Sequence, residues 1–453
     1  MAELSRRAFI TRSSAAAGGL ALGVAAACSG SDDDGDAGSA GGSGSGTTAE
    51  ARAGEPFDPA DWASVRAQFP LRSDSAAFSA YVLASHPAPV AEAIARHRAG
   101  LDEDTHAYLG ETETDAETAV RDTAAEYLGA APAEVALTDS TTMGLGLLYA
   151  SLRVPAGREV LTTEHDFYST HQAWALRAAR DGVVVRRARL YDDPAAATAD
   201  DMVGRLMAQV TPATRVVAVT WVHSGTGVRL PVRAIADALA AANSGRGPEE
   251  RALLCVDGVH GLGVVDAGVR DLGCDFLVAG THKWLFGPRG TGIVWGRADA
   301  WGQVDPAIPA FEPNSFGEWR NGLPPAPPDG LRFTPGGYHT FEHRWALAEA
   351  FRFHLDIGRD RVAARTTEQA TAIKAGLAEI PAARLVTPTA EDLSAGIVCF
   401  DIEGTEPVEV VGRLAGAGFD TSVTPYADEH VRVGPSIVTT PEEVDGLLEA
   451  LRG

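Results

Sequence analysis

Short apolar runs alternate with longer Ala- and Leu-rich stretches along most of this chain. The short runs have the length and the β-branched content that are typical of buried strands. They span residues 135–138, 159–162, 183–188, 215–221, 252–256, 276–279 and 292–295. Helical stretches, such as 231–243, lie between most of these runs. Because apolar strands that alternate with helices form βαβ units, the pattern predicts an α/β fold with a mainly parallel, seven-stranded sheet.

The pattern changes after a Pro-rich stretch at 321–330. A long helical pattern runs from about residue 340 to 380 and is interrupted near Gly358. Three strand candidates follow, at 384–387, 396–401 and 430–433, with a last helix from Pro441. This order predicts a smaller C-terminal α+β domain over 331–453, behind a large domain with an N-terminal arm over 58–330.

Residues 1–28 have the features of an export signal. Arg6 and Arg7, in the run SRRAFI, resemble the twin-arginine signal, and the apolar stretch 15–27 is too short to span a membrane as a helix. Three alanines and Cys28 then resemble a lipoprotein cleavage box, without the leucine that usually stands three places before the cysteine. We therefore expect export by the twin-arginine route and an extracytoplasmic location. The mature protein is either lipid-anchored through Cys28 or cleaved nearby and released.

The following stretch, 29–57, consists mostly of Gly, Ser, Ala and Asp. Such a composition cannot bury enough apolar surface to offset the entropy of ordering the chain. We therefore expect a flexible tether between the export signal and the folded part.

Composition excludes some classes of partner. The formal net charge of -23 repels phosphate backbones, so we expect no nucleic-acid partner. Apart from Cys28, the cysteines lie in apolar runs and no Cys or His spacing matches a metal site, so we expect buried thiols and no metal.

Lys283 lies in the run AGTHKWLFGPRGTG, which covers 279–292. Most lysines are solvated surface charges, but this one follows an apolar strand and precedes a Gly- and Pro-rich turn. A lysine in a desolvated pocket has a depressed pKa and acts as a nucleophile toward an aldehyde. The run therefore marks Lys283 as a candidate catalytic residue.

Asp257 ends the apolar run LLCVD. Ligands of α/β proteins bind at the carboxyl ends of the strands. A carboxylate at that place can keep a pyridinium nitrogen protonated, so that the ring accepts electrons from a substrate carbanion. By itself the residue reads equally well as a helix N-cap, and the lysine run downstream favours the catalytic reading.

Residues 256–295 resemble the class V aminotransferase family of pyridoxal 5′-phosphate enzymes, which have fold type I. Asp257, a short crossover, His282-Lys283 and a Gly-rich turn follow the family pattern, and the resemblance extends over about residues 75–450. It is closest to the isopenicillin N epimerase-like and cysteine desulfurase-like branch. The resemblance implies that Lys283 holds pyridoxal phosphate as a Schiff base and that Asp257 pairs with the pyridine nitrogen.

The run TDSTT at 138–142 resembles the family's phosphate cup, in which hydroxyl residues stand between a strand and a helix. A helix N-terminus offers free N–H groups and the positive end of the helix dipole to a phosphate. Thr141 is the expected side-chain contact, and Ser140 and Thr142 are expected to contribute mainly backbone N–H groups. A plain N-cap is the alternative.

Further cofactor contacts are implied by the resemblance alone. His165 matches the position that stacks on the pyridine ring, although a single histidine in a loop is more often a solvated or core residue. His260 stands where desulfurases carry a glutamine that contacts the ring hydroxyl. Ser224 replaces a common asparagine. His282 is expected to touch the phosphate, and Thr281 to replace a phosphate-binding serine that many relatives have one residue earlier.

Two more segments extend the resemblance toward a partner subunit and a substrate. The run RFTPGG at 332–337 resembles a Gly-Thr segment that reaches the phosphate of the partner subunit; Gly337 replaces that threonine, and Thr340 is the expected substitute. This implies a homodimer with a shared active site. Arg432, in the C-terminal signature at 431–443, is expected to clamp the α-carboxylate of an amino-acid-like substrate, with a surface strand arginine as the alternative.

The reaction remains open among three outcomes on a substrate bound as an external aldimine: C–S or β-elimination, epimerisation and transamination. Desulfurases carry a nucleophilic cysteine shortly before the arginine, and 416–431 contains none, which argues against a persulfide-forming desulfurase. Residues 165–174 and the HKW form of the lysine run look most like the epimerase-like branch, so elimination or epimerisation is favoured over transamination. The alternative from another class is a non-catalytic surface protein that has retained the fold.

Overall fold

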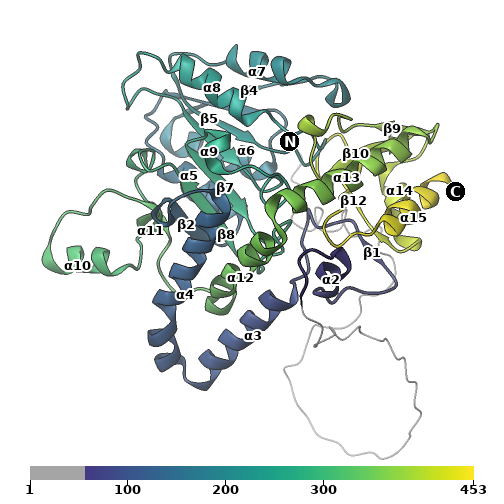
Figure 1. The fold of residues 1–453 in the computed structure, drawn as a ribbon. Coiled ribbons are helices and arrows are strands. Elements are labelled where there is room, and N and C mark those ends of the chain that lie inside the picture. The colour runs from purple at the N-terminus through teal and green to yellow at the C-terminus, as the bar shows by residue number, and fades with distance from the viewer. Residues whose placement is uncertain (1–56) are drawn as a thin grey trace, which may run out of the picture.

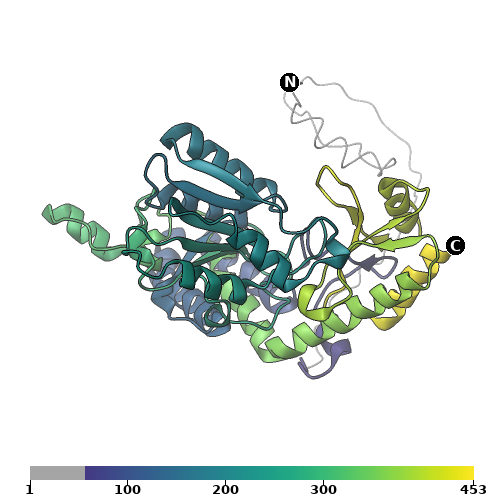
Figure 2. The ribbon, with the colours of Figure 1, turned by 90° about the horizontal axis from the view of Figure 1, so that it is seen from above.

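The computed structural model describes residues 57–453, drawn in Figures 1 and 2. The predicted export signal, Cys28 and all but the last residue of the predicted tether lie outside these residues and stay predictions. No helix within 57–453 is long and apolar enough to cross a membrane.

A seven-stranded sheet forms the centre of the large part of the molecule (Figure 1). Its strands run in the order β2 (Val135–Thr138), β8 (Gly292–Gly296), β7 (Phe276–Gly280), β6 (Leu253–Asp257), β5 (Thr214–Thr220), β3 (Glu159–Thr163) and β4 (Val184–Ala188). Only β8 is antiparallel to its neighbours, and the other pairings are parallel. The predicted α/β fold with a mainly parallel, seven-stranded sheet is confirmed.

Helices cover both faces of this sheet, and β6 shows how the sequence divides between them. Leu253 and Cys255 face a core formed with α5 (Thr141–Ser151) and α6 (Tyr168–Asp181). Leu254 and Val256 face the opposite core, which is formed with the helices α4 (Thr105–Leu128), α7 (Ala199–Met207), α8 (Val232–Ala242), α9 (Val269–Leu272) and α12 (Phe341–Ile357). Because successive side chains of a strand point to opposite faces, a strand buried on both faces must be apolar throughout.

A second, four-stranded antiparallel sheet belongs to the C-terminal part. Its order is β12 (Ser422–Val423), β13 (Val431–Val433), β10 (Val398–Ile402) and β9 (Ala383–Leu385). The helices α13 (Arg359–Ala378), α14 (Pro407–Gly416) and α15 (Pro441–Arg452) pack on it through a separate apolar core. The break between α12 and α13 falls at Gly358, whose φ of +93° suits a residue without a side chain.

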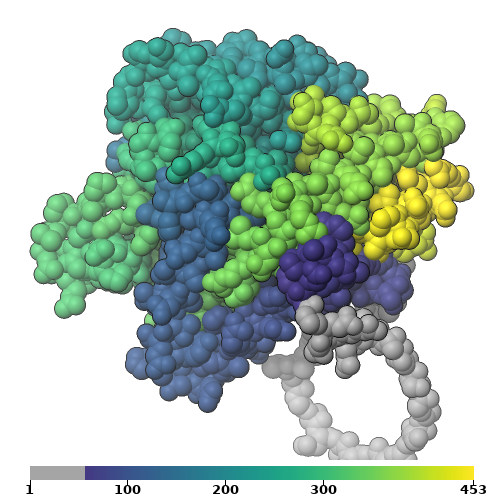
Figure 3. Space-filling model, viewed as in Figure 1, coloured from purple at the N-terminus to yellow at the C-terminus, as the bar shows by residue number. Residues whose placement is uncertain are grey.

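The N-terminal segment joins the two parts. The short strand β1 (Ala76–Ala77) pairs with β11 (Phe419–Asp420), and Arg66 forms an ion pair with Glu443. Figure 3 shows the start of the described chain, in purple, seated against the green and yellow C-terminal elements. The segment predicted as an arm of the large domain thus contacts the smaller part, while the domain boundary at residue 330 stays a prediction.

The remaining elements are short or peripheral. They are α2 (Trp62–Ala67), α3 (Ala88–Glu103), α10 (Pro313–Asn321), α11 (Gly330–Phe333) and the 3-10 turns η1 (Pro132–Glu134), η2 (Pro194–Ala196), η3 (Trp301–Gln303) and η4 (Glu391–Leu393). In Figure 2, α10 stands out from the body of the molecule. Arg332 holds this helix in place through bonds of 2.8 and 2.9 Å to the carboxylate of Glu318.

Candidate active site

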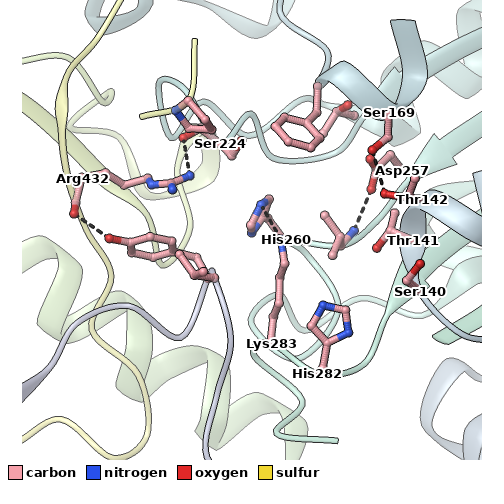
Figure 4. A pocket seen from close by; sticks show the side chains of 16 residues that line it. Ser140, Thr141, Thr142, Ser169, Ser224, Asp257, His260, His282, Lys283 and Arg432 are labelled. Atoms are coloured by element: carbon pink, nitrogen blue, oxygen red, sulfur yellow. Dashed lines mark hydrogen bonds between the residues drawn. The ribbon is translucent and has the colours of Figure 1, made fainter. Parts of the chain in front are cut away.

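A cavity of about 260 Å³ lies between the two sheets (Figure 4). It is lined by the last residues of β5 and β6, the turn after β7, the start of α5, the N-terminal segment and β13. The lining residues that bear on its chemistry are Tyr81, Ser140, Thr141, Thr142, Phe167, Ser224, Asp257, His260, His282, Lys283 and Arg432.

The amine of Lys283 points into this cavity from the turn after β7. Its Nζ atom lies 3.4 Å from Nε2 of His260. Burial and the guanidinium of Arg432 lower the pKa of Lys283, and the carboxylate of Asp257 opposes them; the net direction is downward. The amine is therefore a better nucleophile near neutral pH than an exposed lysine.

The chain contains only one other lysine, Lys374. This lysine is buried and donates hydrogen bonds to the carbonyls of Pro388 and Thr389 and to the hydroxyl of Ser394, at 3.2, 2.9 and 2.8 Å. It does not line the cavity. Lys283 is thus the one lysine amine in a position to react with an aldehyde bound there.

Asp257 is the only carboxylate that lines the cavity within the described residues. It ends β6, and its Oδ1 atom accepts a hydrogen bond of 3.1 Å from the backbone N–H of Val259. Burial raises the pKa of Asp257, while that hydrogen bond and Lys283 lower it; burial dominates. A buried carboxylate of this kind gains from a cationic partner, such as a protonated pyridine nitrogen. No cluster of His, Cys, Asp or Glu suited to a metal ion occurs in 57–453.

The start of α5 and the end of β7 form a polar cup at one end of the cavity. Ser140 caps α5 through a bond from the N–H of Met143, and the N–H of Gly280 donates to the hydroxyl of Thr141 at 2.7 Å. The Nδ1 atom of His282 is buried and has no hydrogen-bond partner in the described part of the chain. A Cβ atom at Gly280 would lie 2.8 Å from the His282 ring.

This cup fits a phosphate group. The first N–H groups of a helix have no acceptor within the helix, and they meet the positive end of the dipole there. The unpartnered His282 nitrogen adds a side-chain contact, and the missing Cβ of Gly280 leaves room beside it. The hydroxyl of Thr142 is instead 2.8 Å from that of Ser169 and holds α6 against α5.

Arg432 forms the opposite end of the cavity (Figure 4). Its Nε and Nη2 atoms donate to the hydroxyl of Ser422, at 3.2 and 3.1 Å, and Nη1 donates to the carbonyl of Ser224 at 3.3 Å. The guanidinium also lies 4.2 Å above the ring centre of Tyr81. Because all these partners are neutral, a buried positive charge remains for an anionic ligand.

Ser224 reaches the cavity through its position after β5. Its hydroxyl is 2.8 Å from the hydroxyl of Tyr426, which lies in the loop between β12 and β13. This pair joins the loop of the small sheet to the large sheet beside Arg432. Ser224 therefore lies at the Arg432 end of the cavity, opposite the polar cup.

Three residues that were expected to contact the cofactor do not line the cavity. His165 stacks on Tyr191 with ring centres 3.8 Å apart, and its Nε2 atom accepts a bond from the N–H of Leu190. Phe167, two residues later, lines the cavity in its place. The hydroxyl of Thr281 is turned into the Gly-rich turn, 2.5 Å from that of Thr291.

Thr340 is the third of these residues. It is exposed at the N-terminus of α12 and lies outside this chain's own cavity. Its expected contact is with a partner subunit, so that contact stays a prediction.

Sequence reasoning missed Tyr81, which lines the cavity, and Trp284, which contacts a lining residue from behind. Tyr81 lies in the N-terminal segment, and its hydroxyl donates a 2.6 Å bond to the carbonyl of Arg432, 351 positions away. No local pattern signals such a contact. Trp284, by contrast, follows Lys283 directly, and its indole N–H donates to Nδ1 of His260 at 3.2 Å; an aromatic residue in that run was a usable signal.

Comparison with known proteins matches most of the chain to the family that its motifs resemble. The family model "Aminotransferase class-V" matches residues 84–424. Isopenicillin N epimerase of Streptomyces clavuligerus is 28% identical over 349 residues, which cover 73% of this chain and 82% of that protein. A probable cysteine desulfurase of Streptomyces coelicolor is 26% identical over 380 residues, covering 79% of this chain and 85% of that protein.

Solved structures share the fold at lower identity. A complex between the cystine C–S lyase C-DES and its reaction product cysteine persulfide superposes with a TM-score of 0.76 at 21% identity, covering 85% of this chain and 99% of that one. The apo structure of cysteine desulfurase from Thermococcus onnurineus NA1 gives a TM-score of 0.72 at 21% identity, covering 86% and 97%.

Proposed function

Since the chain belongs to the class V aminotransferase family of pyridoxal-phosphate-dependent enzymes, we propose that it catalyses β-elimination, foremost at a C–S bond, on an amino acid with a free α-carboxylate. One observation carries this proposal. Among residues 57–453, the cavity is lined by one amine suited to proton transfer, Lys283, and by one guanidinium suited to a carboxylate, Arg432. Asp257, the one carboxylate among these lining residues, lies in the same cavity.

The residues present fit the cofactor. The phosphate cup of Ser140, Thr141 and His282 would hold its phosphate, Asp257 would hold its ring nitrogen, and Lys283 would bond to its aldehyde carbon. When bound, pyridoxal phosphate supplies an electron sink that stabilises negative charge on the substrate α-carbon.

The side chains of the cavity have distinct tasks. Arg432 orients the substrate through its carboxylate, with a planar fork that matches the two oxygens. Once the substrate's amine has replaced it at the aldehyde carbon, Lys283 is a free, neutral amine and would take the proton from the α-carbon. The β-substituent then leaves with its bonding electrons, and a double bond forms between the α- and β-carbons.

The other titratable side chains lining the cavity are poorly placed as bases. The hydroxyl of Tyr81 donates to the carbonyl of Arg432, and Nδ1 of His260 already accepts from Trp284. His282 belongs to the phosphate cup. Elimination needs only one base, which removes the α-proton before the leaving group departs. Inversion with two bases also needs an acid on the opposite face of the substrate, to return a proton there.

Epimerisation is the second candidate function. Its support is the 28% identity to isopenicillin N epimerase, which extends over 82% of that protein. It would require Lys283 to return the proton to either face of the substrate. Transamination is a third outcome of the same test.

Incubation of the purified protein with the common amino acids, cystine and S-alkyl cysteines distinguishes these reactions. Elimination from cystine or an S-alkyl cysteine releases pyruvate, ammonia and a persulfide or a thiol, respectively. Epimerisation exchanges the α-proton for deuterium in deuterated water and inverts the configuration at the α-carbon, while the side chain stays attached. Transamination requires an added keto acid. Proton exchange or amine transfer without pyruvate from any substrate would contradict the elimination proposal.

We also propose that the protein is exported by the twin-arginine route and acts outside the cytoplasm. The support is the run around Arg6 and Arg7 and the box that ends at Cys28. Replacing both arginines with lysine should retain the protein in the cytoplasmic fraction, and Cys28→Ser should abolish labelling with radioactive palmitate. Unchanged export of the double variant would contradict the route, and palmitate labelling of the Cys28→Ser protein would contradict the anchor.

A homodimer with a shared active site completes the proposal. Thr340 is exposed and lies outside the cavity of its own chain, as a residue that serves a partner would. Light scattering of the cofactor-loaded protein should give twice the mass of one chain. The mass of a single chain, or full cofactor retention by Thr340→Val, would count against this arrangement.

A further inference from the structure

We propose that Trp284 is a positioning residue that acts through His260 to keep Lys283 as an unprotonated amine. The inference deepens the proposed function and rests on it, because it concerns the lysine assigned there as base and cofactor anchor. It arises from contacts that link Trp284 to His260 and His260 to Lys283, and of these three residues the proposed chemistry itself requires only Lys283.

The first step is the tautomer of His260. The indole nitrogen of Trp284 can only donate a hydrogen bond, and it lies 3.2 Å from Nδ1 of His260. Nδ1 must therefore carry a lone pair, and a doubly protonated ring would place two hydrogens against each other. A neutral imidazole that accepts at Nδ1 carries its hydrogen on Nε2.

The second step is the direction of that hydrogen. Nε2 of His260 lies 3.4 Å from Nζ of Lys283. An ammonium group can only donate, so its N–H groups would face the N–H of His260 without an acceptor between them. A neutral amine has a lone pair that accepts a hydrogen bond from that N–H. The contact therefore favours the neutral form of Lys283. Burial, Lys283 and Arg432 all hold the pKa of His260 well below its ordinary value, which agrees with a ring that stays neutral.

The indole is held rigidly enough to impose this choice. Trp284 is buried, and its ring tip is enclosed by Gly396 and Gly434 of the C-terminal part. A Cβ atom at these glycines would lie only 2.7 and 3.0 Å from the ring. The N–H is thus aimed by packing, and its direction does not depend on the protonation of Lys283.

Other charges also act on Lys283 and set the background for this effect. Asp257, at the end of β6, favours the ammonium form, while Arg432, on β13, opposes it. His282, in the same turn, is neutral near pH 7, because burial and Lys283 lower its pKa. Trp284 and His260 favour the neutral form of Lys283 and so act against the carboxylate of Asp257, which favours the ammonium form.

The test is the protonation of Lys283 in the full chain freed of cofactor. Cyanate carbamoylates only unprotonated amines, and peptide mass spectrometry separates Lys283 from Lys374, the only other lysine. Trp284→Phe should free His260 to move its hydrogen to Nδ1 and to accept a bond from the ammonium group. The midpoint of the pH profile at Lys283 should then rise by about one unit, which slows carbamoylation about tenfold below the midpoint.

Two further variants separate the effect that Trp284 exerts through His260 from the general effect of removing a buried indole. Trp301→Phe is the matched control, because Trp301 is equally buried and its indole nitrogen has no hydrogen-bond partner in the described residues; it should leave the midpoint unchanged. In a His260→Leu background, Trp284→Phe should add no further shift. An unchanged midpoint in Trp284→Phe, or the same shift without His260, would overturn the proposal.

A measurement on the unaltered chain covers the case in which Trp284→Phe fails to fold. Long-range ¹H–¹⁵N spectra distinguish the two histidine tautomers, and the His260 signals are those missing in His260→Leu. We expect the neutral ring with its hydrogen on Nε2 at neutral and alkaline pH, since its pKa lies well below the ordinary value. A hydrogen on Nδ1 would refute the inference. Failure of Lys283 to take up pyridoxal phosphate would instead refute the proposed function.

Discussion

Replacing Arg432 tests how the cavity recognises its substrate. A guanidinium has five N–H donors, and three of them are used by Ser422 and Ser224. One N–H on Nη1 and one on Nη2 remain, and a single carboxylate can accept both. Hydrogen bonds to charged groups contribute about 1.5–3 kcal/mol each. Arg432→Lys keeps the charge and loses one bond of the fork, so kcat/KM should fall about 10- to 150-fold. Arg432→Gln loses the charge as well, and the fall should reach about 10²- to 10⁴-fold.

The assay compares an amino-acid substrate with the amine that lacks its carboxylate. The unaltered enzyme should discriminate strongly between them, and both variants should lose most of that discrimination because the amine never used the fork. Arg384→Lys is the matched control, since Arg384 lies on β9 of the same sheet and pairs with Asp401 at the surface. A loss of less than about threefold in Arg432→Gln, beside an unchanged melting temperature, would refute the role of this residue.

Three further substitutions test the cup and the core. Gly280→Ala places a Cβ atom 2.8 Å from His282 and 3.0 Å from the Thr141 hydroxyl, so pyridoxal phosphate should bind about tenfold more weakly or worse in equilibrium dialysis; unchanged affinity would mean that the phosphate lies elsewhere. Leu254→Ala on the central strand should lower the free energy of unfolding by about 2–5 kcal/mol in urea titrations, and a cost below about 1 kcal/mol would contradict the packing described. His354 is fully buried among aromatic rings, and burial lowers its pKa to about 3. Below about pH 6.5 the imidazole of His354 takes up a proton in the unfolded chain but not in the folded chain. The free energy of unfolding therefore decreases as the pH falls from 6.5 toward 3, by up to about 1.4 kcal/mol per pH unit. His354→Phe should flatten this part of the pH–stability curve, and equal slopes would show that His354 does not set it.

The sheet could be predicted because its strands are buried on both faces. A strand such as β6 must then be apolar at every position, and that run is visible without any knowledge of its neighbours. The strands β11 and β12 span two residues each and were not predicted. Elements this short carry no period, and only their pairing across the chain defines them.

Much of the cavity could be predicted for a related reason. Asp257 is the last residue of β6, and Lys283 lies in the turn after the neighbouring strand β7. The carboxyl ends of parallel strands meet at one edge of a sheet. His165 also follows a strand, but the backbone after β3 turns its ring onto Tyr191 and brings Phe167 to the cavity. Which of two residues in a loop faces a site depends on tertiary packing, and spacing alone does not decide it.

The contacts of Tyr81 and Trp284 lay beyond sequence reasoning. Tyr81 meets Arg432 because β1 pairs with β11 and draws the N-terminal segment across the C-terminal part. Trp284 could be read from its run as a buried aromatic, but its bond to His260 depends on the angle at which the indole is packed.

Borohydride reduction of the purified protein with pyridoxal phosphate tests the central claim most directly. The chain has two lysines, so Lys374 serves as an internal control in the same digest. The protein should be yellow, and reduction should attach the cofactor to the peptide that contains Lys283, with Lys374 unlabelled. Lys283→Ala should remain unlabelled. A protein that stays colourless with added pyridoxal phosphate, or a label on Lys374 in place of Lys283, would contradict the assignment of this cavity as the active site.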